Sequence, residues 1–237
     1  VTSKRRLKEL VDKNVVSGWD DPRLPTICGM KRRGYPAAAI RNFCHSLGVS
    51  KKETVIDIEK LEDAVREELN KTALRAMAVC RPIKLTITNY PDGEGEILTV
   101  SNHPQDEALG KRQVPFSKEV YIDREDFSFD PPKGFHRLAV GKEVRLRYAY
   151  VVKCNEVVTD PKTGEITELL CTYDPNTLGK KPEGRKVKGI IHWVSQATAQ
   201  PAEVRIYERL FDHPFPVEAE KRGGSMLEHL NKSSLVV

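Results

Sequence analysis

The spacing of apolar residues changes once along the chain and divides it into two parts. Up to about residue 74, apolar side chains recur every three to four positions, which is typical of amphipathic helices. From Pro82 onwards they alternate with polar ones, and Asp92-Gly93 is a typical turn sequence. The sequence therefore predicts a multidomain chain, α-helical first and then all-β.

The first part contains signals for four helices. Thr26 is a suitable cap, Gly34 and Gly48 are suitable stops, and Pro36 fits the start of a helix. We expect residues 16–74 to form a helical subdomain. Its predicted helices cover 26–33, 36–47 and about 12 to 14 residues from Asp57, and a further helix covers 4–14.

The second part contains short strand-like runs joined by turns, including a hairpin signal at residues 160–164. Short strands without helices are typical of antiparallel barrels or sandwiches. About 155 residues favour two small barrels over residues 75–237, with the second cut short at the C-terminus. The expected strands are 83–88, 97–100, 119–123, 144–152, 165–173, 187–194 and 203–210.

Basic residues are concentrated in a few segments. The net charge is +5, and residues 1–82 carry 17 basic and 11 acidic side chains. Residues 133–153 hold six basic residues and one acidic residue, and residues 180–188 hold five and one. Such clusters indicate a surface for a polyanion. The alternative is a solvated face whose partner charges lie elsewhere in the fold.

Other classes of protein are excluded by what the sequence lacks. Its hydrophobic content of 39% is too high for a disordered chain, and no apolar run is long enough to span a membrane. The five cysteines are odd in number and form no C-x-x-C pair, which argues against a disulfide framework and a structural zinc site. We therefore expect a cytoplasmic protein with no metal site.

The chain opens with Thr2-Ser3-Lys4-Arg5-Arg6 just before the first predicted helix. A lysine and backbone N–H groups near a helix start can hold a triphosphate. Taken alone, this pentapeptide is a weak signal that favours a solvated helix start over a phosphate site.

Longer motifs follow in a fixed order, and together they resemble the glutaminyl-tRNA synthetase family of class I aminoacyl-tRNA synthetases. The resemblance covers residues 1 to about 211. Its segments are Gly18–Thr26, Lys31–Gly34, Ala39–Cys44, Ala76–Val79, Asn102–Pro104, Arg112–Phe116, Gly141–Arg147, Gly184–Gly189 and His192–Val194.

The resemblance implies an enzyme that joins glutamine to ATP and transfers it to its tRNA. Residues 1–15 would be the remainder of a catalytic domain. Thr2, Ser3, Lys4 and Arg5 would form its ATP-binding signature loop, with Lys4 as the catalytic residue, although Met is commoner than Thr2. Both ends look cut and the Rossmann domain is missing, so we expect this piece alone to be inactive and to bind no cofactor. The full-length enzyme would use ATP with Mg.

The resemblance also implies that the β part binds the tRNA anticodon. Arg75, Arg137, Arg145 and Arg147 match the family's anticodon contacts, and residues 144–150, as one strand, would place Arg145 and Arg147 on one face. Proteins read single-stranded bases through hydrogen bonds from side chains such as arginine and through stacking on flat surfaces. Lys180, Lys181, Lys186 and Lys188 would attract the tRNA backbone.

The expected partners are therefore glutamine tRNA, with ATP and glutamine in the full-length enzyme, and the expected state is a monomer. Two alternatives remain. The first is an archaeal or eukaryotic-type glutamyl-tRNA synthetase, which shares the segment from Gly18 to Arg23. The second is a stand-alone RNA-binding module, against which the Ser3-Lys4-Arg5 loop argues, because such a module needs no ATP.

Overall fold

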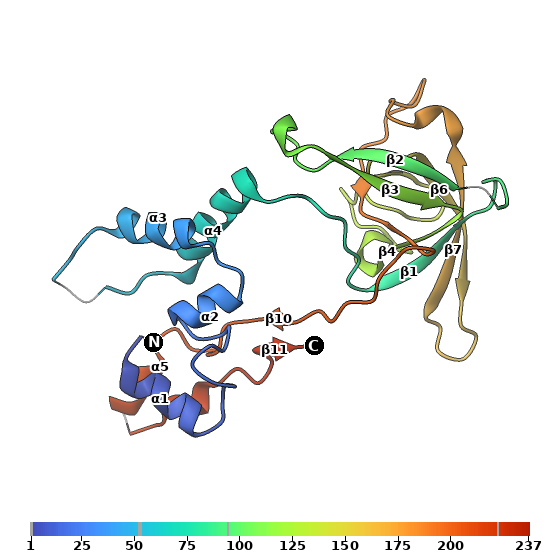
Figure 1. Ribbon diagram of the computed structural model, residues 1–237. Coiled ribbons are helices and arrows are strands. Elements are labelled where there is room, and N and C mark those ends of the chain that lie inside the picture. The colour runs from blue at the N-terminus through green and yellow to red at the C-terminus, as the bar shows by residue number, and fades with distance from the viewer. Residues whose placement is uncertain (1, 52–53, 94, 222) are drawn as a thin grey trace. The chain divides into compact units, whose positions relative to one another are not determined.

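The computed structural model describes residues 2–51, 54–93, 95–221 and 223–237. The chain folds as two units, one formed by residues 1–73 with 203–237 and the other by residues 74–202. The first unit holds the long helices and the second holds a large β-sheet (Figure 1). The predicted order of helices followed by strands is therefore confirmed.

The four predicted helices are confirmed, and the first unit contains one more. Thr26 caps its helix as expected, because its hydroxyl accepts a hydrogen bond from the backbone N–H of Gly29 at 2.9 Å. Gly48 ends another helix at φ +67°, a conformation that glycine adopts easily. The helices are α1 (Lys4–Asp12), α2 (Ile27–Arg32), α3 (Ala37–Leu47), α4 (Ile58–Thr72) and α5 (Pro216–Lys221).

Two small cores hold the first unit together. Ala39 of α3 packs against Leu61 and Val65 of α4, where the two helices lie side by side (Figure 1). Leu7 and Leu10 of α1 belong to the second core, whose other buried members are Val16, Leu24, Leu210 and Met226.

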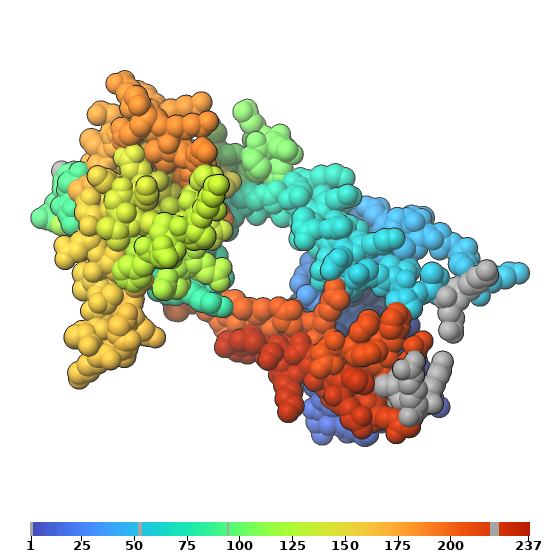
Figure 2. Space-filling view, turned by 180° about the vertical axis from the view of Figure 1, so that it is seen from behind, coloured from blue at the N-terminus to red at the C-terminus, as the bar shows by residue number. Residues whose placement is uncertain are grey.

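Residues 203–237 are placed differently from the sequence prediction, which assigned them to the barrel region. They form part of the first unit (Figure 2) because Leu210 and Met226 are buried in the same core as α1. Of the predicted strand 203–210 only two residues pair, in β10 (Ile206–Tyr207) with β11 (Leu235–Val236). The segment is fixed by side-chain packing rather than by a sheet.

A buried ion pair connects two distant segments of the first unit. The carboxylate of Asp21, with a side chain only 3% exposed, accepts hydrogen bonds from Nε and Nη2 of Arg23 at 2.9 and 2.8 Å. It also accepts the backbone N–H of Ser17 at 2.9 Å. The same guanidinium donates to the carbonyl of Val15 and to Oγ of Ser234. One arginine thus joins residues 15–23 to the C-terminal segment.

The second unit is built on a mixed seven-stranded sheet with the order β8-β5-β6-β7-β1-β4-β9. Its pairs are antiparallel except β1 with β7 and β5 with β8. Strands β2 and β3 form a separate two-stranded ribbon. The strands are β1 (Pro82–Ile87), β2 (Gly95–Ser101), β3 (Lys111–Ser117), β4 (Glu119–Asp123), β5 (Glu143–Leu146), β6 (Val151–Thr159), β7 (Ile166–Asp174), β8 (Ile190–Ile191) and β9 (Val194–Ser195).

The predicted alternation of strand β1 is confirmed, since Ile83, Leu85 and Ile87 are all buried in one core with Phe116 and Trp193. Within the described residues this core serves a single half-barrel, and the predicted second barrel has no closed sheet of its own. Residues 178–189, which precede β8, form neither helix nor strand.

The predicted strand 144–152 is wrong in its middle, where a turn separates β5 from β6. Tyr148 has φ +65°, and the N–H of Ala149 donates to the carbonyl of Leu146 at 2.8 Å. The indole of Trp193 fixes the turn by donating to the carbonyl of Arg147 at 2.8 Å. Arg145 and Arg147 therefore do not share one continuous strand face.

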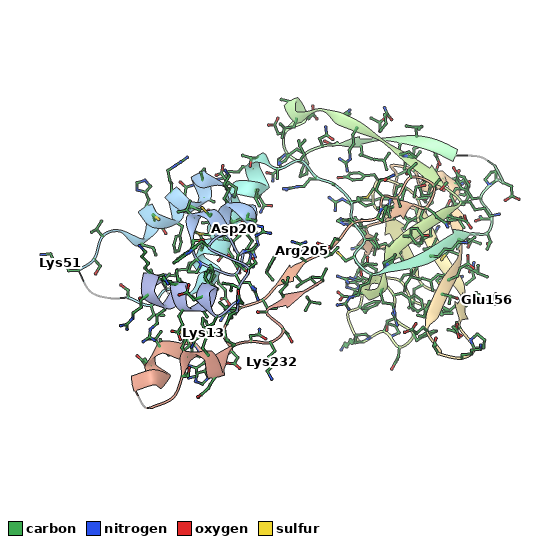
Figure 3. All side chains as sticks on the ribbon, turned by 60° about the horizontal axis from the view of Figure 1, so that its bottom comes forward. Lys13, Asp20, Lys51, Glu156, Arg205 and Lys232 are labelled. Carbon is green, nitrogen blue, oxygen red and sulfur yellow. The ribbon has the colours of Figure 1, made fainter. Side chains whose placement is uncertain are left out.

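We expect Asp21→Asn to destabilise the first unit by about 3 kcal/mol, because it leaves the guanidinium of Arg23 without its buried counter-charge. Urea unfolding followed by the fluorescence of Trp19, in a Trp193→Phe background, measures this. Asp20→Asn is the matched control, because Asp20 (Figure 3) is 58% exposed and pairs with Arg32 at 3.1 Å. Equal losses in both variants would contradict the prediction.

The same loss should depend on pH. Burial alone would raise the pKa of Asp21, but hydrogen bonds from Arg23 and Ser17 hold it well below its usual value. Ionised Asp21 therefore stabilises the fold at pH values above its unfolded pKa of about 3.9, and this contribution is lost as the pH falls towards the lower folded value. The difference between the native chain and Asp21→Asn should shrink below about pH 4.

Candidate nucleic-acid interface

An open pocket of about 660 Å³ in the second unit gathers most of the unit's clustered positive charge. Glu143 is its single acidic lining residue, while Pro131 and Phe135 add apolar surface. Cations beside an apolar wall suit a nucleotide, which combines a charged phosphate with a flat base. The basic lining residues are Arg137, Lys142, Lys153, Arg185, Lys186 and Lys188.

A close backbone approach shapes one wall of this pocket. At Gly189 a Cβ atom would lie 1.8 Å from the carbonyl oxygen of His136, so that only glycine allows the two backbones to touch. The Gly189 carbonyl in turn accepts the backbone N–H of Arg145 at 2.9 Å. These contacts fix the end of the basic segment, residues 178–189, against β5.

Arg185 anchors the middle of the basic segment to the sheet. Its Nε lies 2.9 and 3.1 Å from the two carboxylate oxygens of Glu143, and its Nη2 lies 2.6 Å from Asp174. The hydrogen bond from Arg185 lowers the pKa of Asp174. Its charge is thus balanced inside the protein. The lysines of the segment, which are Lys180, Lys181, Lys186 and Lys188, are exposed and form no ion pair within the described residues.

Arg137 also lines the pocket. Its Nη1 donates to the carbonyl of Glu125 at 3.1 Å and lies 3.2 Å from the carboxylate of Asp126. Burial raises the pKa of Asp126, and the charge of Arg137 opposes this effect. Because both contacts use Nη1 and half of the side chain is exposed, other N–H groups of the guanidinium can reach a ligand.

The two arginines near the β5–β6 turn have different surroundings. The guanidinium of Arg145 donates to three backbone carbonyls, those of Ala149 at 2.9 Å, Thr177 at 2.7 Å and Lys180. It therefore ties the start of the basic segment to the turn. The guanidinium of Arg147 instead lies 5.2 Å from the ring centre of Tyr148, in a cation–π arrangement.

Three of the predicted tRNA-binding residues, Arg137, Lys186 and Lys188, meet at the pocket. Arg75 does not line it; the residue comes after α4 and before β1 in the sequence, is half-buried, and donates its backbone N–H to the carbonyl of Asn102 at 2.7 Å. Arg145, Arg147, Lys180 and Lys181 also lie outside the lining.

Sequence reasoning did not single out Lys142, Lys153 and Arg185, although the pocket includes all three. All three belong to the two basic segments that the charge count identified. Their meeting in one pocket depends on the pairing of β5 with β6 and on the Arg185 contacts.

The predicted ATP-binding loop lies at the start of α1. Thr2, Ser3, Lys4 and Arg5 are exposed, and Ser3 occupies the N-cap position; Val1 lies outside the described residues. The first helical turn carries basic residues and no acidic ones, although a helix N-terminus favours negative charge. An anion bound there would relieve this repulsion.

A metal-ligand cluster and a membrane-spanning helix are both absent from the described residues. No three histidine, cysteine or acidic side chains come together as metal ligands within that part of the chain. Among the helices described, none combines the length and the apolar character needed to cross a membrane.

Family models for class I tRNA synthetases of the E and Q type match three successive stretches. The catalytic-domain model matches residues 1–71, and two anticodon-binding models match residues 73–174 and 190–237. The second unit thus falls largely within the first anticodon-binding match, and so does the part of the pocket lining from Pro131 to Lys153, whereas the lining residues 185–189 lie between the two anticodon-binding matches.

Proteins named glutamine–tRNA ligase match the chain over its whole length. The protein of Clostridium perfringens is 54% identical over 238 residues, that of Pseudomonas putida 52% over 237 and that of Citrobacter koseri 53% over 238. The chain spans 41–42% of the length of these relatives. Models of one family match three successive stretches of the chain, and these relatives match its whole length. The chain therefore belongs to the class I tRNA synthetases for glutamate and glutamine.

Proposed function

We propose that the chain is the tRNA-binding part of a glutamine–tRNA ligase and that the basic pocket receives a nucleotide of the anticodon. The observation that carries this proposal is a pocket with six basic and one acidic lining residues, inside a unit that matches an anticodon-binding model. The relatives named for glutamine favour this substrate over glutamate. The catalytic-domain match over residues 1–71 disfavours a stand-alone RNA-binding module.

Different basic residues would perform different tasks. Lys142, Lys153, Lys186 and Lys188 present compact charges suited to phosphates, and they would supply affinity without sequence preference. Arg137 and Arg147 keep their guanidinium groups close to the surface, where a planar fork can pair with a base edge. The ring of Tyr148 beside Arg147 would offer a stacking surface.

The contacts of Arg145 suggest an indirect role. Its N–H groups hold the carbonyls of Ala149, Thr177 and Lys180, so it would position the turn and the basic segment rather than read a base. For Arg75, we keep the anticodon contact that the family resemblance implies.

The complete enzyme would activate glutamine with ATP and Mg and would act in the cytoplasm as a monomer. Of its active site, this chain would contribute Thr2, Ser3, Lys4 and Arg5 at the start of α1. Lys4 would stabilise negative charge on the phosphates as the adenylate forms, and Ser3 would orient the loop. The cations of the first helical turn, which the helix dipole disfavours, are suited to this anion.

Substitution of Arg147 should affect anticodon discrimination. We expect Arg147→Ala to weaken the binding of glutamine tRNA by about 1–3 kcal/mol more than the binding of a tRNA with an altered anticodon. Arg147→Lys should also bind glutamine tRNA more weakly, because lysine lacks the planar fork of arginine. Lys188→Ala is the control. It should weaken the binding of both tRNAs alike and reduce the slope of the salt dependence by an amount equivalent to about one phosphate contact. Binding is measured at two salt concentrations. If Arg147→Ala weakened the binding of the two tRNAs equally, and Arg147→Lys restored the binding of both, Arg147 would be a phosphate contact.

Loss of Arg185 should release the basic segment. Arg185→Ala removes the bonds to Glu143 and Asp174, so we expect faster tryptic cleavage within residues 178–189 of the folded chain. We also expect a larger loss of tRNA affinity than for Lys181→Ala, the control that removes the same charge. Arg185→Lys should not restore protection, because an ammonium group cannot reproduce the fork. Cleavage at the native rate in Arg185→Ala would contradict this role.

Lys4 can be tested in the complete enzyme. Lys4→Ala should lower the rate of adenylate formation by an amount equivalent to about 2–4 kcal/mol while leaving apparent ATP affinity nearly unchanged, because charge develops in the transition state. Isotope exchange between pyrophosphate and ATP, followed over a range of ATP concentrations, measures the rate and the apparent ATP affinity. A normal rate with only a raised KM for ATP would assign Lys4 to ground-state binding.

A further inference from the structure

Two of the five free cysteines face each other in the core of the second unit. Cys154 of β6 and Cys171 of β7 are direct partners in the antiparallel register, and both are completely buried. Figure 3 labels Glu156, which lies two residues after Cys154 on β6. A register irregularity separates Cys154 from Glu156, so the extra residue Asn155 falls next to the pair.

The backbone hydrogen bonds identify the kind of pair that these cysteines form. Cys154 directs its N–H to the carbonyl of Lys142 at 3.2 Å and accepts the N–H of Gly141 at 2.7 Å. The carbonyl of Cys171 accepts the N–H of Thr88 at 2.8 Å. These groups point away from the partner strand, as in a non-hydrogen-bonded pair. The Cα atoms of such pairs lie about 4.5 Å apart, within the range that a disulfide spans.

The two thiols also interact directly. A hydrogen bond from the Cys171 thiol lowers the pKa of Cys154, while the same bond together with burial raises the pKa of Cys171. Cys154 is therefore the thiol of the pair that ionises more readily, and its Sγ also donates to the carbonyl of Glu156 at 3.7 Å. Cys171, its partner in the register, is the thiol placed to close a disulfide with it.

We propose that Cys154 and Cys171 form an oxidisable dithiol site that hydrogen peroxide converts into a cross-strand disulfide. The Cys154 thiol releases its proton and its sulfur attacks one peroxide oxygen. The O–O bond breaks and the departing hydroxide takes up that proton, so a sulfenic acid and one water result. The Cys171 sulfur then attacks the sulfenic sulfur and displaces the second water, so two thiols and one peroxide give one disulfide and two waters. A small dithiol reverses the reaction by exchange and is itself oxidised.

The site is connected to the basic pocket through the backbone of Cys154. Gly141 and Lys142, which bond to it, line the pocket, and so does its neighbour Lys153. Closing the S–S bond would change the packing around Cys154 and, through these backbone bonds, the position of this wall and the two lysines. Oxidation should therefore change RNA affinity, an expectation that rests on the proposed function.

The test uses the 237-residue chain with the three exposed cysteines, Cys28, Cys44 and Cys80, replaced by serine. After treatment with hydrogen peroxide the chain is unfolded, alkylated and mapped by mass spectrometry. We expect one Cys154–Cys171 disulfide, which a dithiol reverses. Cys171→Ala, checked for folding by circular dichroism, should instead accumulate a sulfenic acid at Cys154 that dimedone traps. Two alkylated thiols after peroxide, or a sulfinic acid without disulfide, would overturn the proposal.

Binding of glutamine tRNA to the reduced and oxidised chains tests the connection to the pocket. We expect the disulfide form to bind several-fold more weakly, and we expect peroxide-treated Cys154→Ala to bind as its untreated form does. A disulfide that left the affinity unchanged would overturn the connection. If the reduced chain bound no tRNA, the proposed function would fail while the mass-spectrometric result for the dithiol site stood unaffected.

Discussion

The basic pocket depends on how one irregular segment is held against the sheet. Residues 178–189 carry five basic side chains but form no helix or strand, so no ladder of backbone hydrogen bonds fixes them. Three polar contacts replace that ladder. The Arg145 side chain holds the start of the segment, Arg185 holds its middle, and the hydrogen bond from the backbone N–H of Arg145 to the carbonyl of Gly189 holds its end. Without them, mutual repulsion would disperse the lysines.

Several arginines of this chain have a different task from the lysines of the basic segment. Arg23, Arg145 and Arg185 direct their planar guanidinium groups to protein acceptors, some of which are distant in the sequence. A rigid fork with five N–H groups fixes the directions of several acceptors, whereas the ammonium of a lysine is a flexible point charge with three donors. The lysines of the basic segment remain exposed, where their charge can meet a polyanion. Basic residues therefore serve both the framework and the proposed binding surface.

Sequence periodicity and local chemistry were enough to define α1 to α4 and part of the sheet, but not α5 or the turn between β5 and β6. Apolar spacing predicted α1 to α4, the cap at Thr26 and the stop at Gly48, because these depend on neighbours within a few residues. The alternation in β1 gave its buried face for the same reason. Charge counting found both basic segments, and ordered motifs indicated the family, but the predicted roles of Arg75 and Arg147 remain predictions.

Contacts between distant residues decided the remainder, and linear spacing carries no record of them. The left-handed backbone of Tyr148 divides a run that alternates like one strand, since Trp193 holds the turn from 46 residues away. Leu210 and Met226 join the core of α1, which no local pattern indicates. Cys154 meets Cys171 only because the β6–β7 register pairs them, and Lys142 meets Lys188 only because β5 lies between β6 and β8. The sequence by itself determined α1 to α4, the approximate position of most strands of the sheet and where charge is concentrated, whereas the tertiary structure determined where those strands break and which side chains meet.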